Sequence, residues 1–259
     1  MSTSDFVFER GERVPIGSNG ETDYVFVSDD PVPNTGVSEL VFESGVGVGG
    51  VSEYGPVLWN IDDGTETMFE LDKEDFSVIR SYGYSGTRDG IGGHAGVLYA
   101  SQRGPPKAEE REPSDFSQIR VAGVPGDAEG IGGDTERIWY IASGNGERLY
   151  ELDVADFSVI QDREVGISNI EGCGGKRDVI WFSGYSNGEL AEADTTDLSV
   201  IRQTGTGYGS VDGTGGAPDV GWFASRDTSK NYEFDPSDLS VIKSGGSPDK
   251  NFERGIGGA

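Results

Sequence analysis

The chain has little of what most enzyme active sites are built from. Its 259 residues include one histidine, His94, and one cysteine, Cys173. A single cysteine excludes an intrachain disulfide. One His and one Cys also give little material for a zinc site or for a nucleophile activated by histidine. We expect the two residues to lie in different repeats of the fold, with Cys173 as a small buried side chain and not a nucleophile.

Long apolar runs and phosphate-binding loops are missing as well. No stretch approaches the length of a membrane span, and the first five residues, 1–5, hold neither a basic nor an apolar signal region. The Gly-x-x-x-x-Gly-Lys-Ser/Thr pattern does not occur. We therefore expect no membrane insertion, no export by a visible signal and no nucleotide loop.

Positive charge is scarce. Asp and Glu number 46 against 20 Lys and Arg, so the formal net charge is -26, and the acids are scattered along the chain. Such a surface repels itself at ordinary salt, whereas molar salt shortens the Debye length to about 3 Å. This balance is typical of a protein from an extreme halophile or from a virus that infects one; an ordinary acidic protein is the alternative. The same charge disfavours binding to nucleic acid.

Glycine, by contrast, is abundant and periodic. The motif Gly-Ile-Gly-Gly or a variant of it recurs six times, in steps of 40 to 43 residues, beginning at Gly47, Gly90, Gly130, Gly172, Gly213 and Gly255. A second motif, Asp-Phe-Ser-Val-Ile or a variant, recurs in steps of 40 or 41 residues from Asp75, Asp115, Asp156, Asp197 and Asp238. A fixed period near 40 residues indicates one supersecondary unit stacked on copies of itself.

Each period holds four β-like runs, which is the pattern of a propeller blade. We predict an all-β fold with a single β-propeller domain over residues 1–259 and six four-stranded blades; seven blades are the alternative. Five intact repeats span 47–254. Strand 255–258, within the C-terminal segment 255–259, would join three strands from residues 1–46 in the closing blade, which removes exposed sheet edges.

The repeated motifs have structural interpretations within such a blade. Glycine allows the first strand to approach its neighbours closely at the axis. The second residue of that motif would point between blades, and Cys173 occupies this position in its repeat. The Asp and Ser of the second motif would hydrogen-bond a turn, and the Phe or Leu after the Asp would pack on a neighbouring blade.

Four carboxylates form the one candidate metal site. Asp89, Glu129, Glu171 and Asp212 each precede the first strand of a repeat, and Arg254 takes the same place in the last one. Equivalent positions converge at one mouth of the channel, where oxygen ligands attract a hard cation such as calcium or magnesium. The alternative is that these acids are merely solvated, as most would be in so acidic a protein.

Aromatic residues in the loops form the candidate binding surface. Tyr82, Tyr84, Tyr185, Tyr208 and Phe252 lie among Gly, Ser and Asn in loops that we expect on one face. Aromatic rings among polar groups stack on sugars or anchor protein partners. These residues would otherwise pack down on their own loops.

The repeat resembles those of proteins encoded by haloarchaea and their tailed viruses. The resemblance is carried by Tyr150-Glu151-Leu152-Asp153 and by the run from Asp156-Phe157-Ser158-Val159-Ile160 to Gly172, and it covers about residues 47–258. In that group the repeats are propeller blades. The resemblance implies a virion component, in tail or head decoration, that is used in attachment.

These observations predict a non-enzymatic interaction module in a haloarchaeal virus particle. Its partners would be other virion proteins and a host cell-surface protein or glycan, with several copies in each assembly. One alternative is a metal-assisted hydrolase with a carboxylate-lined channel. Another is a scaffold protein in the haloarchaeal cytoplasm.

The net charge yields a first prediction. The melting temperature should rise steeply between dilute buffer and molar KCl, because added salt screens the repulsion among the acids. Thermal unfolding followed by circular dichroism at stepped KCl concentrations measures this. A melting temperature that does not depend on salt would contradict the halophilic interpretation.

Overall fold

A computed structural model describes residues 57–247, apart from 63, 95, 144–145, 177–178, 187 and 218, and also residues 14–16, 23–25 and 253–258. The chain forms two compact units, Met1–Gly49 and Gly50–Ala259. In the first unit, β1 (Val14–Ile16) pairs with β2 (Asp23–Val25) as a two-stranded antiparallel sheet.

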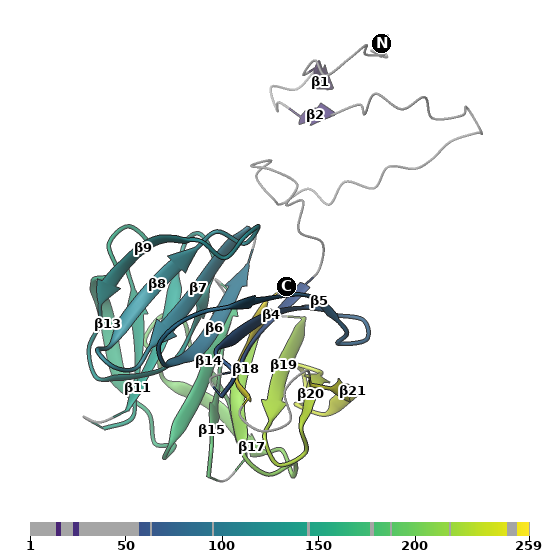
Figure 1. Ribbon diagram of the computed structural model, residues 1–259. Coiled ribbons are helices and arrows are strands. Elements are labelled where there is room, and N and C mark those ends of the chain that lie inside the picture. Colours follow the sequence, from purple (N-terminus) through teal and green to yellow (C-terminus); the bar gives the residue numbers. More distant parts are fainter. Residues whose placement is uncertain are drawn as a thin grey trace, which may run out of the picture. The chain divides into compact units, whose positions relative to one another are not determined.

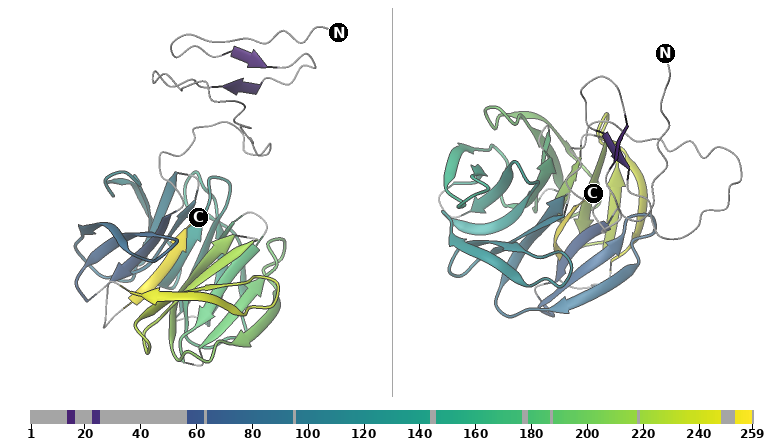
Figure 2. Two further views of the ribbon diagram at one scale, coloured as in Figure 1. Left: turned by 90° about the vertical axis from the view of Figure 1, so that its right-hand side faces the viewer. Right: turned by 90° about the horizontal axis from the view of Figure 1, so that it is seen from above.

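In the second unit the described strands form five four-stranded antiparallel sheets, arranged radially around one axis (Figure 1 and Figure 2). Blade 1 consists of β22 (Glu253–Gly258), β3 (Val57–Asp62), β4 (Thr67–Asp72) and β5 (Val78–Gly83). Blade 2 consists of β6 (Arg88–His94), β7 (Val97–Gln102), β8 (Lys107–Arg111) and β9 (Gln118–Gly123). Blade 3 consists of β10 (Asp127–Gly133), β11 (Ile138–Ser143), β12 (Arg148–Leu152) and β13 (Val159–Glu164). Blade 4 consists of β14 (Ile170–Lys176), β15 (Val179–Gly184), β16 (Glu189–Ala193) and β17 (Val200–Gly205). Blade 5 consists of β18 (Val211–Ala217), β19 (Val220–Ser225), β20 (Lys230–Phe234) and β21 (Val241–Gly246).

The all-β propeller is confirmed, but the predicted number of blades was wrong. The C-terminal strand β22 does close the ring, yet it pairs with β3, and residues 57–83 supply the rest of its blade. The sequence has six glycine motifs, but the described part of the chain forms only five sets of the other three strands, and the last motif pairs with the first set. The motif at 47–50 lies outside the described residues, as does most of the segment 1–46 that was expected to supply three strands.

Glycine makes the narrow axis of this ring possible. A β-carbon on Gly132 would lie 2.7 Å from the Cα of Gly174 in the next blade, and one on Gly92 would lie 2.9 Å from the Cα of Gly132. Even strands that are not neighbours in the ring, β6 and β14, have Cα atoms within 8 Å of each other. Backbone therefore packs directly against backbone at the centre, where no side chain would fit.

Apolar side chains fill the spaces between blades. Each second strand carries a buried aromatic residue, and the Phe or Leu of the next blade's Asp-Phe-Ser turn packs against it, as predicted. Phe116 of blade 2, for example, meets the ring of Trp59 in blade 1 edge-on, with centroids 5.2 Å apart. In the same way, Leu198 of blade 4 shares a buried cluster with Trp139 of blade 3.

The Asp-Phe-Ser turn has one conformation in all five blades. In blade 1, the amide of Ser77 donates to Asp75 Oδ1 at 2.8 Å, and Phe76 has a positive φ of 60°. The hydrogen bonds from serine lower the pKa of this aspartate. They do the same for the four equivalent residues, which are Asp115, Asp156, Asp197 and Asp238. The turn therefore keeps its carboxylates ionised and holds the apolar side chain toward the neighbouring blade.

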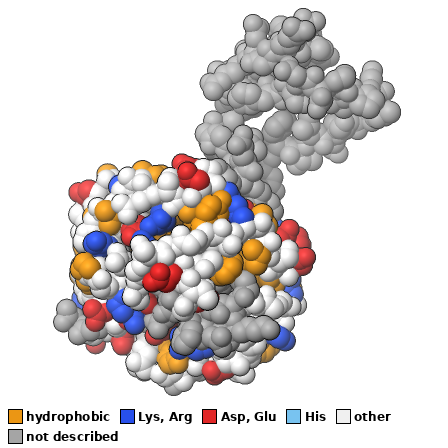
Figure 3. Space-filling model, viewed as in Figure 1, with side chains coloured by type: hydrophobic (Ala, Val, Ile, Leu, Met, Phe, Trp, Pro, Cys, Tyr) orange, Lys and Arg blue, Asp and Glu red, His pale blue; other side chains and the backbone are white. Residues whose placement is uncertain are grey.

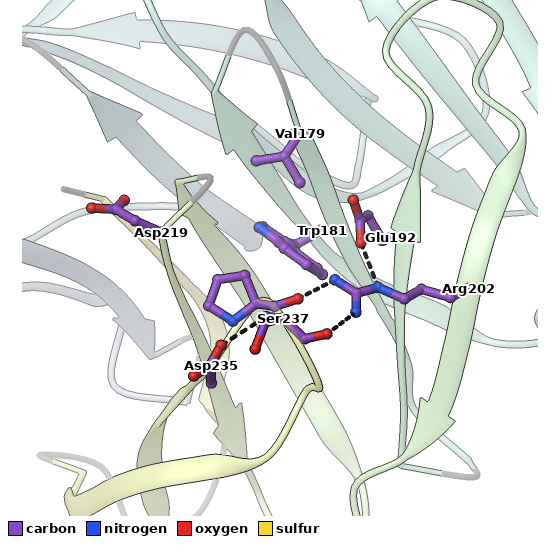
Figure 4. A pocket seen from close by; sticks show the side chains of 8 residues that line it. Val179, Trp181, Glu192, Arg202, Asp219, Asp235 and Ser237 are labelled. Carbon is purple, nitrogen blue, oxygen red and sulfur yellow. Dashed lines mark hydrogen bonds and ion pairs between the residues drawn. The ribbon is translucent and has the colours of Figure 1, made fainter.

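A glutamate and a basic residue also join neighbouring blades. In blade 4, Arg202 Nε donates to Glu192 Oε2 at 2.6 Å, and the guanidinium donates to the carbonyls of Pro236 and Ser237 in blade 5 (Figure 4). Arg80 with Glu70 and Arg120 with Glu110 make the same contacts. We call this arrangement the interblade latch. Charge-assisted hydrogen bonds from one blade to the carbonyls of the next fix the spacing of adjacent sheets.

Blade 3 replaces the arginine of the latch by glutamine and finds its cation elsewhere. Gln161 Nε2 donates to Glu151 at 2.6 Å. Arg137, at the start of the second strand, lies 3.3 Å from the same carboxylate and donates to the Thr195 carbonyl of blade 4 at 3.1 Å. A guanidinium from a different strand therefore takes over the interblade contact.

The glycine packing leads to a second prediction. Gly132→Ala should destabilise the propeller by about 1–3 kcal/mol or more, because the added methyl overlaps backbone that cannot turn away. Thermal or chemical unfolding measures the loss. Gly205→Ala is the matched control, because a β-carbon there meets nothing within 4 Å. Equal stability of the two variants would contradict the backbone packing described here.

Candidate functional site

The four predicted acids all lie at β-bulges of the inner strands. The register of each inner strand shifts by one residue at Asp89, Glu129, Glu171 and Asp212, and it does so again at Arg254. A bulge leaves its extra residue out of the ladder and re-aims the side chain. Asp89 and Asp212 are fully buried, Glu129 is 5% exposed and Glu171 is half-buried.

Two arginines form ion pairs with three of these acids. Arg103, just after β7, lies with Nε 3.4 Å from Asp89 Oδ2 and is also ion-paired with Glu129 of the next blade. Arg226, just after β19, donates from Nε to Asp212 Oδ2 at 2.7 Å. It also donates to the hydroxyl of Tyr185, in blade 4, at 3.2 Å. Each arginine thus ties two adjacent blades together at this mouth of the ring.

The electrostatics join these residues into one cluster. Burial lowers the pKa of Arg103, but the charges of Asp89, Glu129 and Glu171 raise it above the usual value overall. For Arg226, burial again lowers the pKa, whereas Asp212, Tyr185 and Glu171 raise it. Glu171 therefore acts on both arginines. Four carboxylates and two guanidinium groups give this cluster, the mouth cluster, a formal charge of 2 - 4 = -2.

The predicted calcium or magnesium ion gains no geometric support. Among the residues that the structure describes, no group of three or more His, Cys, Asp or Glu side chains is placed to hold a metal. Arginine nitrogens lie next to Asp89, Glu129 and Asp212, in the positions to which these carboxylates would attract a metal cation. The four acids do come together, but metal binding stays a prediction.

Sequence reasoning missed the partners of the acids, although a signal was present. The partner follows its acid by 14 residues: Arg103 follows Asp89, Ser143 follows Glu129 and Arg226 follows Asp212. Ser143 Oγ donates to Glu129 Oε1 at 2.5 Å. The constant spacing reflects one inner strand, a short turn and one second strand. The latch pairs have a constant spacing of their own, ten residues, as in Glu70 and Arg80.

The four tyrosines of the predicted binding surface pack within the protein. Tyr82 stacks on Phe116 of blade 2 with ring centroids 4.1 Å apart. Tyr84 donates to the Asp62 carbonyl at 3.1 Å. Tyr185 lies under the Arg226 guanidinium, and Tyr208 lies 4.4 Å from the ring of Tyr232. All four are half-buried, and Phe252 lies outside the described residues. Their role in binding a partner or glycan stays a prediction.

The single cysteine and single histidine belong to different blades, as predicted. Cys173 lies on β14, is 3% exposed and packs in the apolar cluster between blades 3 and 4. Burial raises the pKa of its thiol, so the thiolate form that a nucleophile needs is disfavoured. His94 ends β6 opposite Val97. Among the described residues, no helix is long and apolar enough to span a membrane.

The mouth cluster gives a third prediction. Arg226→Leu should cost about 3 kcal/mol or more of unfolding free energy, because it leaves the Asp212 carboxylate buried without its cation. Adding Asp212→Asn should restore part of the loss. Arg148→Leu, which breaks an exposed pair with Asp162, is the control and should cost far less, because solvent screens an exposed pair. Denaturant titration checks all three, and similar losses for both arginines would refute the buried pairing.

Comparison with known proteins supports the fold and nothing finer. No family model matches the sequence, and no curated protein matches it. A structure of a nidogen/laminin complex aligns over 78% of this chain and 98% of its own, with 11% identity and a TM-score of 0.51. Glutaminyl cyclase from Myxococcus xanthus aligns over 62% of this chain and 70% of its own, with 13% identity and a TM-score of 0.53. At such identities the likeness extends to the architecture alone, and this chain is a β-propeller.

Proposed function

We propose that this propeller is a non-enzymatic interaction module that binds a protein partner through its outer rim. We further propose that it is a structural or attachment component of a haloarchaeal virus particle. The observation that carries the first proposal is a row of exposed isoleucines, one in each blade. The second rests on the resemblance of the repeats and on the acidic composition.

The isoleucines occupy equivalent positions on the outermost strands. Each is the second residue of its strand, and each is between 51% and 58% exposed: Ile79, Ile119, Ile160, Ile201 and Ile242. We call them the rim isoleucines. In blades 1 and 3 an exposed valine, Val78 or Val159, precedes the isoleucine. Figure 3 shows apolar patches interspersed with charged side chains on one face of the surface.

High salt makes these apolar side chains especially important for binding a partner. In molar salt the Debye length is about 3 Å, so the acidic surface neither steers nor holds a distant partner. Excluded salts strengthen the burial of apolar surface. In such a medium, affinity would depend on apolar contacts and on backbone pairing. The outermost strand of each blade offers both, because it is a sheet edge.

Two further observations favour binding over catalysis. The only cysteine is buried, and arginine or serine engages three of the four acids at the mouth. The rim isoleucines, by contrast, make a repeated surface of the kind that suits many weak contacts. Several copies in one particle would multiply a weak affinity for a host cell-surface protein or for another virion protein. A scaffold role in the haloarchaeal cytoplasm would require the same salt adaptation.

The test compares two sets of substitutions on the outer strands. The full chain, immobilised in molar KCl, is incubated with detergent-solubilised haloarchaeal envelope, and bound protein is quantified by mass spectrometry. Replacing the five rim isoleucines by threonine should reduce binding at least about tenfold, because about 1 kcal/mol or more of apolar burial is lost at each residue engaged. The control changes exposed polar residues of the same strands, with Ser81→Thr, Gln118→Thr and Ser244→Thr, and should bind as the unmodified chain does.

Separate outcomes bear on the two parts of the proposal. Binding that survives the isoleucine substitutions, in protein with an unchanged melting temperature, would refute the rim as the binding surface. Mass spectrometry of purified virus particles tests the second part, and absence of the chain from them would refute it. Turnover of a small ester or lactone by the purified chain would favour a hydrolase instead.

A further inference from the structure

The interface between blade 5 and blade 1, the seam, contains two fully buried asparagines. Asn60 on β3 pairs directly with Phe69 on β4, and directly paired residues share a face of the sheet. Phe69 packs on the apolar cluster of the seam, so Asn60 faces this cluster. Asn231 on β20 pairs with Ala224, which belongs to the same cluster. Both asparagines are 0% exposed, and both face the seam.

Neither amide has a hydrogen-bond partner among the described residues. This holds for both the nitrogen and the oxygen of Asn60 and of Asn231. Burying an amide that no protein group pairs with costs free energy, so the folded state is disfavoured. The seam therefore contains four such atoms.

The other four interfaces have apolar residues at the equivalent positions. The counterparts of Asn231 are the second residues of the third strands, and the counterparts of Asn60 follow the aromatic residue of the second strands. At these four interfaces the equivalent pairs are Met68 with Ala100, Ala108 with Tyr140, Leu149 with Phe182 and Leu190 with Phe223. Both members of each pair belong to one buried cluster, so the asparagine pair is specific to the seam.

The latch at the seam also makes fewer contacts than the three latches built on a third-strand glutamate and a fourth-strand arginine. Lys243 pairs with Glu233 at 2.9 Å and donates to one carbonyl of blade 1, that of Lys73, at 2.7 Å. Arg80, Arg120 and Arg202 each donate to two carbonyls of the next blade. A lysine lacks the planar fork that allows two parallel hydrogen bonds.

We propose that the seam is the place where the ring opens. In this opening, β22 separates from its partner β3 and remains joined to blade 5 through the chain. The buried asparagines and the lysine latch lower the free energy of this opening relative to opening at any other interface. Local unfolding of the propeller therefore begins at this one interface. This inference does not depend on the proposed function.

Native-state hydrogen exchange of the full chain in molar KCl tests the proposal. The β3 amides that pair with β22 should exchange about tenfold faster or more than the β7 amides that pair with β6, given the cost of unpaired buried amides. The variant with Asn60→Ala and Asn231→Met copies the Ala100 and Met68 pair. In this variant the β3 amides should slow to the rate of the β7 amides, and the melting temperature should rise.

The double substitution separates the proposal from simple fraying of a terminal strand, which would not respond to it. Ala100→Asn is the matched control and should speed exchange at the interface of blades 1 and 2 while the seam keeps its own rate. Equal exchange of β3 and β7 in the unmodified chain would overturn the proposal, and this measurement needs no variant. A double variant with unchanged exchange or a lower melting temperature would overturn it as well.

Discussion

Direct packing of backbone against backbone at the axis is the constraint on which the rest of the propeller depends. The inner strands carry glycine where a β-carbon would otherwise strike the next strand, as at Gly132 beside Gly174. Strands that approach this closely form a ring of small radius, and the five inner strands that the structure describes are enough to fill its centre. A side chain at these positions would force the blades outward and leave space to be filled.

The narrow axis also determines where polar chemistry can lie. Since the centre is filled by backbone, charged side chains of the inner strands are directed to the mouth, and the β-bulges at Asp89, Glu129 and Asp212 turn them there. In this position they are too buried to remain unpaired, and residues 14 positions later supply their partners. The mouth cluster is accordingly a set of contacts between blades. The exposed, repeated features lie at the opposite edge of each sheet, on the rim.

The sequence predicted the strands and the main packing contacts of each repeat. The four strands of each period, the packing of Phe116 on a neighbouring blade and the burial of Cys173 all follow from patterns within about 40 residues. The blade count depends on a choice between two nearly identical motifs, at 47–50 and 255–258, as the partner of β3. Local sequence does not distinguish them, because this pairing joins residues almost 200 positions apart in the chain. The arginine partners of the acids were missed because acid and arginine belong to different strands, so their constant spacing appears only when the two strands are compared.

A ring of repeats closes at one interface, where the last blade meets the first. In this protein, departures from the repeat occur at that interface. At the seam, asparagines replace apolar residues and a lysine replaces an arginine. Gly245 also stands there, with the ring of Phe76 only 2.5 Å from where its β-carbon would be. Four interfaces join consecutive blades, so they form between neighbours in the chain. The seam joins the two ends of the repeat array, so its contacts span the most residues and carry the largest loop-closure entropy. This interface can be the least stable one without altering the apolar clusters that join the other four pairs of blades.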